Sequence, residues 1–175
     1  RVSMYNRSLS RIYHIQKSGG IRATGEINGF FPISIATQNL KKALEDAEII
    51  LLVVPAHAHG CLAKKIAPFL KDGQIILLNP GRTFGSIEFR QVIERERGKS
   101  RIVIGEAQTL IFTSRAMKKN EVNVLKIKNS VKFSTFPSNH VDLAHDALKD
   151  IFPQLVPHSD YLEVSMNNIG MLLHP

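Results

Sequence analysis

Short apolar runs alternate along this chain with longer segments in which apolar residues recur every three or four positions. Runs rich in β-branched residues and leucine, typical of strands buried on both faces, cover three ranges: 48–54, 74–78 and 101–105. Residues 60–70 and 85–97 have helical periodicity, and Gly98 is placed to end the second helix. Strands that alternate with helices of this length predict βαβ units and an α/β fold with a mostly parallel, doubly wound sheet and helices on both faces.

Further elements are predicted before and after this region. Residues 2–5 form a strand-like run, and 8–17 suit a helix with Leu9, Ile12 and Ile15 on one side and Gly19-Gly20 as its stop. The pair Asn28-Gly29 predicts a hairpin. Other predicted elements are a short helix over 37–47, an antiparallel strand pair over 122–127 and 131–136, and helices over 141–152 and from 162.

Composition places the chain among ordinary globular proteins. Of its 175 residues 43% are hydrophobic and 22% charged, and the single cysteine, Cys61, excludes a disulfide within the chain. No apolar run approaches the ~18 residues of a membrane helix, and no signal segment is visible, so we expect a cytoplasmic protein without a membrane partner. The net charge of +8 permits an anionic partner. Because the basic residues are scattered, we expect no nucleic-acid partner.

Both ends of the sequence are typical of a fragment of a longer chain. The sequence begins at Arg1 without a methionine and ends at His174-Pro175 directly after an apolar helical pattern. No G-x-G-x-x-G loop between a strand and a helix is present. We therefore expect a fragment: residues 1–160 as a dinucleotide-binding domain without its first strand, and 161–175 as the start of a linker helix toward an absent helical domain.

In a doubly wound sheet, ligands bind beyond the carboxyl ends of the strands. Asn6, Arg7 and Ser8 follow the first strand-like run. An acidic residue at such a position holds the ribose of NAD, whereas an arginine accommodates the 2′-phosphate of NADP. Arg7 therefore favours NADP if this strand is the second of the fold. A solvated turn in which Ser8 caps a helix explains the same residues equally well.

After the next strand, Val54-Pro55-Ala56 leaves a ledge of small residues beside which a flat ring can lie. His57, His59 and Cys61 follow it. Their spacing fits no common zinc pattern and lacks a fourth ligand, so we expect no metal site and interpret the histidines as residues at a helix start.

Three further positions carry possible chemistry. The loop 79–85 is glycine-rich and leads into a helix, so it suits either an anion site or a structural turn. Glu106, at the end of the strand 101–105, could bind a cationic amine or pair with an arginine such as Arg115. His174 lies at a helix break before Pro175, where a histidine can exchange protons near neutral pH, although a lone histidine is more often structural.

Taken together, these residues resemble the opine dehydrogenases of the octopine and nopaline type, which are related to glycerol-3-phosphate dehydrogenase. The resemblance covers essentially the whole chain. It is carried by Asn6-Arg7-Ser8 and by the following stretches: EIILLVVPAHAHG (48–60), GQIILLNPGRTFGSIEF (73–89), GEAQTLIFTSR (105–115), FSTFPS (133–138) and LEVSMNNIGMLLHP (162–175).

The resemblance implies a Rossmann-like domain in an enzyme that condenses an amino acid with an α-keto acid and reduces the imine with NADP(H) or NAD(H). It implies that His174 is the general acid/base, that Asn6 to Ser8 and Val54 to Ala56 bind the cofactor, and that four residues meet the substrate: Arg82, Glu106, Thr109 and Asn168. A homodimer is a further expectation. Alternative functions are a glycerol-3-phosphate or 2-ketoacid reductase of the same superfamily and a non-catalytic nucleotide-binding module.

Overall fold

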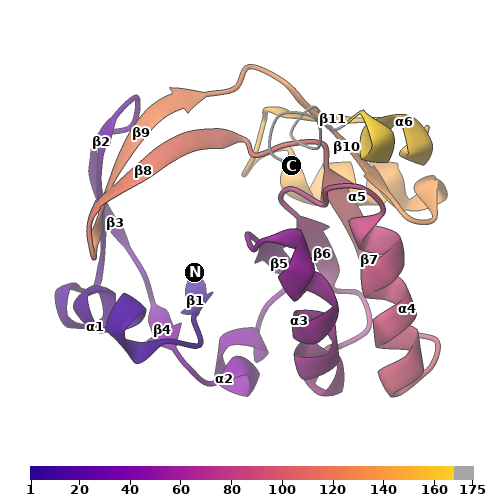
Figure 1. Ribbon diagram of the computed structural model, residues 1–175, viewed down its shortest axis with the longest axis horizontal. Helices are drawn as coiled ribbons and strands as arrows, with labels where there is room; N and C mark the ends of the chain where they lie inside the picture. Colours follow the sequence, from indigo (N-terminus) through magenta and orange to yellow (C-terminus); the bar gives the residue numbers. More distant parts are fainter. Residues whose placement is uncertain (168–175) are drawn as a thin grey trace. The chain divides into compact units, whose positions relative to one another are not determined.

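The computed structural model describes residues 1–167, which form two compact units (Figure 1). One unit consists of residues 1–47 and 112–128, and the other of residues 48–111 and 129–167. The chain therefore leaves the first unit, builds most of the second, returns to the first for one pair of strands, and then completes the second.

The first unit begins with the strand and helix that the sequence predicts. β1 (Ser3–Tyr5) pairs in parallel with β4 (Ile35–Thr37), and α1 (Leu9–Ser18) and α2 (Leu40–Leu44) pack beside these strands. Ile12 and Ile15 are buried, whereas Leu9 is 50% exposed, so the predicted apolar face of α1 is one residue shorter than expected. Gly19 ends the helix in the left-handed region, with φ 76°.

A four-stranded sheet completes this unit, with the order β3-β2-β9-β8. β2 (Gly20–Gly25) and β3 (Gly29–Pro32) form the predicted hairpin, and β8 (Phe112–Lys118) and β9 (Glu121–Ile127) form a second one. The predicted antiparallel pairing of 122–127 with 131–136 is wrong. Alternation identifies a strand but not its partner, and the strand β8, whose side chains are almost all exposed, was hidden by its polar composition.

The second unit contains a five-stranded sheet of order β11-β10-β7-β6-β5. Its strands are β5 (Ile49–Leu52), β6 (Ile75–Leu78), β7 (Val103–Ala107), β10 (Val131–Thr135) and β11 (Leu155–Pro157). The three strands of the predicted βαβ region are parallel, and β10 runs antiparallel to β7. β6 is buried throughout, as predicted, but β5 alternates between half-buried and buried residues, because it lies at the edge of this sheet.

Helices cover both faces of the five-stranded sheet. They are α3 (His59–Ile66), α4 (Gly85–Arg97), α5 (Val141–Leu148) and α6 (Tyr161–Met166), with single 3₁₀ turns at Ala56–Ala58, Ala67–Phe69 and Ser138–His140. Successive residues of a strand point to opposite faces. Phe133 of β10 lies against His145 of α5, whereas Ser134 shares a face with Glu106, whose carboxylate contacts α4 and α6. α5 therefore covers one face, and α4 and α6 the other.

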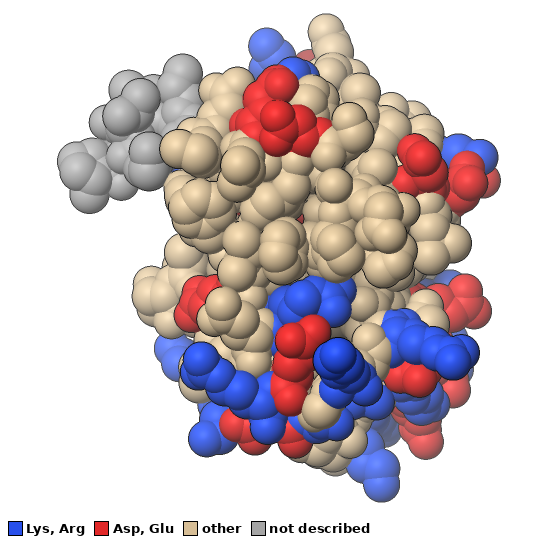
Figure 2. All heavy atoms as spheres, turned by 90° about the vertical axis from the view of Figure 1, so that its right-hand side faces the viewer, with Lys and Arg blue, Asp and Glu red and all other residues tan. Residues whose placement is uncertain are grey.

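On the face drawn in Figure 2, basic side chains do not form a patch free of acidic ones. Lys and Arg side chains are concentrated at one end of this face, but Asp and Glu side chains are interspersed among them, and much of the rest is uncharged. Among the described residues, no helix combines the length and apolar character needed to cross a membrane.

Candidate active site

The loop between β6 and α4, residues 79–84, has an unusual backbone. Arg82 and Phe84 adopt φ values of 62° and 60°, in the left-handed region that residues with a side chain seldom occupy. Gly81 lies so close to β7 that an added Cβ would be 2.2 Å from the Cβ of Glu106, and its N–H donates to the carbonyl of Ala107. Strained backbone of this kind persists only where the surrounding structure holds it in place. It is common at functional sites.

Glu106 accepts a hydrogen bond from the first turn of α4. The residue before this helix, Phe84, provides no side-chain cap, and the Ser86 N–H donates to Oε2 of Glu106 over 2.8 Å. The carboxylate is 1% exposed and projects from β7 into the positive end of the helix. Its other oxygen, Oε1, is buried without a hydrogen-bond partner. Glu106 is thus a buried acid that completes a helix N-terminus, with one oxygen still able to accept a hydrogen bond.

Tyr161, the first residue of α6, joins this carboxylate. Its hydroxyl donates to Oε2 of Glu106 over 3.0 Å and accepts a hydrogen bond from Oγ of Ser86 over 2.9 Å. Burial, and after it the charge of Glu106, raises the pKa of Tyr161 to about 12. The phenol therefore stays protonated at physiological pH and acts here as a donor.

Ser165 makes the fourth contact of this group. Its side chain is fully buried, and its Oγ accepts a hydrogen bond of 2.7 Å from the backbone N–H of Phe84. The sequence did not point to Ser86, Tyr161 or Ser165. Each is a common residue at a helix start or within a helix, and only the packing of α6 on α4 brings them together.

His59, at the start of α3, is another buried polar residue of this unit. It is hydrogen-bonded to the backbone of Val54, and its Nε2 is buried without a partner. Burial lowers the pKa of His59, so the ring is neutral at physiological pH. No group of three or more potential metal ligands occurs among residues 1–167, and Cys61 is exposed.

The predicted cofactor residues follow β1 and β5, one set in each unit. Arg7 is exposed, and Oδ1 of Asn6 accepts a hydrogen bond from the Ser8 N–H over 2.9 Å, which closes a tight turn at the end of β1. Ser8 is the N-cap residue of α1, as the alternative predicts, but its side chain makes no capping hydrogen bond. After β5, Val54 is half-buried, and Pro55 and Ala56 are exposed at the start of a 3₁₀ turn.

The predicted substrate residues lie around the carboxyl ends of β6 and β7. Arg82 is partly exposed in the strained loop, and Thr109 is partly exposed two residues beyond β7. The hydrogen-bond partners of Glu106 described above are Ser86 and Tyr161, while the alternative partner Arg115 belongs to β8 of the first unit. Asn168 and His174 lie outside the described residues.

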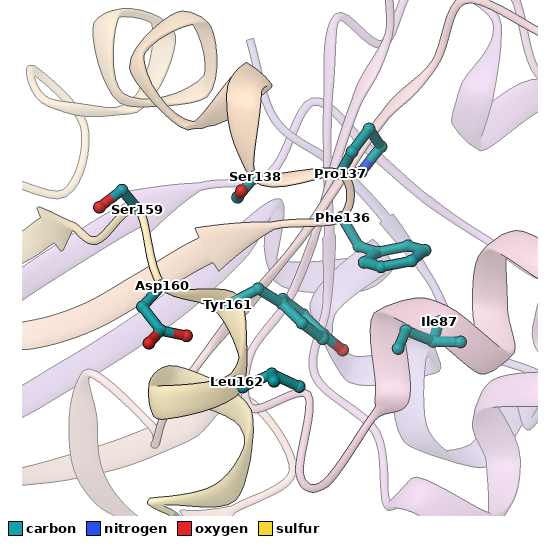
Figure 3. Close-up of a pocket in the computed structure, with 8 residues that line it drawn as sticks. All are labelled: Ile87, Phe136, Pro137, Ser138, Ser159, Asp160, Tyr161 and Leu162. Carbon is teal, nitrogen blue, oxygen red and sulfur yellow. The ribbon is translucent and has the colours of Figure 1, made fainter.

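An open, mainly apolar depression of about 520 Å³ borders α6 (Figure 3). Figure 3 shows the rings of Phe136 and Tyr161 side by side in its wall, with their centroids 5.2 Å apart. The carboxylate of Asp160 caps α6 by accepting a hydrogen bond from the Glu163 N–H. Tyr161 therefore has two roles: its ring lines this depression, and its hydroxyl belongs to the buried polar group.

Comparisons with known proteins agree with this fold. No family model matches the chain. It is 36% identical over 175 residues to "Opine dehydrogenase" of Arthrobacter sp. (strain 1C), a match that covers 99% of this chain but 48% of that protein. The chain therefore spans about half the length of this relative.

Solved structures of similar fold include octopine dehydrogenase with NADH and L-arginine, with a TM-score of 0.73 and 16% identity over 93% of this chain and 43% of that one. Another is yersinopine dehydrogenase with NADP⁺ bound, with a TM-score of 0.82 and 15% identity over 100% of this chain and 46% of that one. The expected Rossmann-like fold is thus confirmed. The chain is therefore similar in sequence to an opine dehydrogenase, of which it spans about half, and similar in fold to octopine and yersinopine dehydrogenases.

Proposed function

We propose that this chain is the NAD(P)H-binding part of an opine dehydrogenase-type oxidoreductase. The observation that carries this proposal is the 36% identity with an opine dehydrogenase along 99% of the chain. Neighbours of the same fold have NADH or NADP⁺ bound, which supports a nicotinamide cofactor. We do not propose the alternative of a simple ketoacid reductase, because the relative with the sequence match is an opine dehydrogenase.

In the proposed reaction, the amine nitrogen of an amino acid attacks the carbonyl carbon of an α-keto acid, and loss of water leaves an imine. The cofactor supplies a hydride to the imine carbon and leaves oxidised, and a proton on the nitrogen completes the secondary amine. We assign proton transfer to His174, because the resemblance implies a general acid/base at this position and an imidazole can both donate and accept protons. The proposed substrate residues, described below, hold the two substrates in contact.

The turn after β1 fits the adenosine end of the cofactor. The exposed guanidinium of Arg7 follows the strand, and no acidic residue accompanies it at Asn6 or Ser8. A planar cation pairs well with a phosphate, whereas an acid there would repel one. We therefore propose NADP(H) as the preferred cofactor, with Asn6 and Ser8 as polar neighbours, and the ledge Val54-Pro55-Ala56 as a cofactor contact.

On the substrate side, we propose that Arg82, Glu106, Thr109 and Asn168 lie near the reacting molecules. A guanidinium such as that of Arg82 suits the carboxylate that every α-keto acid carries. The free oxygen of Glu106 suits an amine donor, although its depth limits it to a close approach or to a bridging water. We also propose that residues 161–175 lead into a helical substrate domain in the complete enzyme.

The test is cofactor oxidation by the full-length protein, with NADPH and NADH used separately and with pyruvate and a panel of amino acids. We expect oxidation that requires both co-substrates and that is lost in His174→Ala. Oxidation by the keto acid alone would assign the protein to the simple reductases. Absence of oxidation with every pair, despite a stable fold, would contradict the proposed activity.

Cofactor preference has its own test. Replacing Arg7 by alanine removes a charge-assisted contact worth about 1.5–3 kcal/mol, so we expect the KM for NADPH to rise about tenfold or more and the KM for NADH to change little. Arg11→Ala is the matched control, because Arg11 is an exposed arginine in the first turn of α1. Equal changes of both KM values in Arg7→Ala would refute the assignment of Arg7 to the 2′-phosphate.

A further inference from the structure

Two side chains of α6 contact the start of α4 and the loop before it. Ser165 accepts the hydrogen bond of the Phe84 N–H, and Tyr161 bonds to both Ser86 and Glu106. Tyr161 and Ser165 are four residues apart, so they lie on the same face of the helix. Both are buried, at 7% and 0% exposure. This face of α6 therefore meets the loop at Phe84 and the first turn of α4 at Ser86.

The loop requires such support. Phe84 is in the left-handed region at φ 60°, and its N–H precedes the first turn of α4, where a helix supplies no acceptor. Ser165 supplies that acceptor from outside the helix. A left-handed residue with a side chain is disfavoured in isolation, and the bond to Ser165 stabilises this backbone.

Arg82 is located between two fixed points. On one side Gly81 is held against β7 by its bond to the carbonyl of Ala107, with no room for a Cβ beside Glu106. On the other side Phe84 is held by Ser165. The backbone that carries Arg82, itself in the left-handed region at φ 62°, is therefore held on both sides.

We propose that Ser165 and Tyr161 are positioning residues that hold the loop before α4 and thereby direct the guanidinium of Arg82 toward the carboxylate of the α-keto acid. This inference rests on the proposed function, in which Arg82 meets the substrate. It adds that α6, which contains no proposed catalytic residue, determines the affinity for the keto acid and leaves cofactor binding unaffected.

The first experiment is steady-state kinetics of Ser165→Ala in the full-length protein. We expect the KM for the keto acid to rise about tenfold, which corresponds to the loss of one well-made buried hydrogen bond, while the KM for NAD(P)H changes less than about twofold. Ser159→Ala is the matched control, because Ser159 is an exposed serine close to the same helix. An unchanged KM for the keto acid, or a parallel rise of both KM values, would overturn the proposal.

The second experiment is rescue by glycine at position 84. Glycine adopts the left-handed region without a steric cost, so Phe84→Gly reduces the need for the Ser165 hydroxyl. We expect the double variant Ser165→Ala with Phe84→Gly to recover at least about threefold of the lost kcat/KM for the keto acid. If the two substitutions are simply additive, Ser165 supports packing alone and the proposal fails.

The third experiment does not depend on turnover. The Phe84 amide should be protected from hydrogen exchange in the unsubstituted protein and exchange about tenfold faster or more in Ser165→Ala and in Tyr161→Phe. Equal exchange rates of the Phe84 amide in the variants and in the unsubstituted protein would show that Ser165 and Tyr161 do not hold the loop. If the unsubstituted protein forms no opine, the proposed function fails, and the exchange data still show whether α6 holds the loop.

Discussion

The hydroxyl of Tyr161 gives the structure a testable dependence on alkaline pH. Tyr161→Phe removes a donor to the Glu106 carboxylate and an acceptor for Ser86, and leaves the hydroxyl of Ser86 without this partner. A hydrogen bond to a buried charged group contributes about 1.5–3 kcal/mol. We therefore expect Tyr161→Phe to lower the free energy of unfolding at neutral pH by about 2 kcal/mol.

This difference should shrink as the pH rises. The pKa of Tyr161 is raised from 10.0 to about 12, so the unfolded chain loses the phenol proton before the folded one does. The stabilisation is complete below pH 10 and is lost as the pH rises through about 12. Each pH unit in that range removes about 1.4 kcal/mol from the unsubstituted protein, whereas the phenylalanine variant lacks this dependence.

Urea unfolding followed by far-ultraviolet circular dichroism measures this effect, because the chain has no tryptophan for fluorescence. We would compare Tyr161→Phe with the unsubstituted protein at about pH 8 and about pH 11, where the difference should fall by about 1.4 kcal/mol. Tyr13→Phe is the control, because the side chain of Tyr13 is 48% exposed. A difference between the two proteins that is the same at both pH values would refute the buried tyrosine–carboxylate contact.

Three further outcomes are expected from the second unit. Gly81→Ala should destabilise the protein by about 1–3 kcal/mol or more in urea unfolding, because its Cβ would lie 2.2 Å from that of Glu106. Phe89→Ala should cost about 3–5 kcal/mol in the same assay, because Phe89 of α4 is fully buried, while Leu162→Ala, at a site 55% exposed, should cost much less. The pKa of His59 is lowered in the folded protein, so the unfolded chain binds the proton first as the pH falls. The free energy of unfolding should therefore decline below about pH 6.5, and decline less steeply in His59→Asn. An identical acid dependence of the two proteins would contradict this.

The sequence predicted the elements whose signals are local. The range of α4 is the predicted one, because its periodic apolar residues end at Gly98, which adopts a positive φ of 76°. The hairpin at Asn28-Gly29 and the end of α1 at Gly19 were predicted for the same reason. These residues restrict the backbone directly, so their effect does not depend on distant parts of the chain.

Long-range relations were not available from the sequence. β10 has the same alternating pattern that suggested a pairing with 122–127, yet it inserts between β7 and β11 in the other unit. Likewise, Glu106 was expected at a strand end, but its bonds to Ser86 and Tyr161 link positions 20 and 55 residues apart. A pattern of hydrophobic and polar residues specifies which faces are buried and contains no information on which neighbour covers them.

Because α4 begins on the carboxylate of Glu106 and the hydroxyl of Ser165, its first turn is not a locally stable unit. The helix completes its N-terminus only when residues from β7 and α6 are in place, 20 and 81 positions away. Local opening should therefore occur as one event: α4, the end of β7 and α6 should lose amide protection together. During folding, the first turn of α4 should form only after Glu106 and Ser165 have reached their native positions. We therefore expect α4 to form late and cooperatively with the sheet.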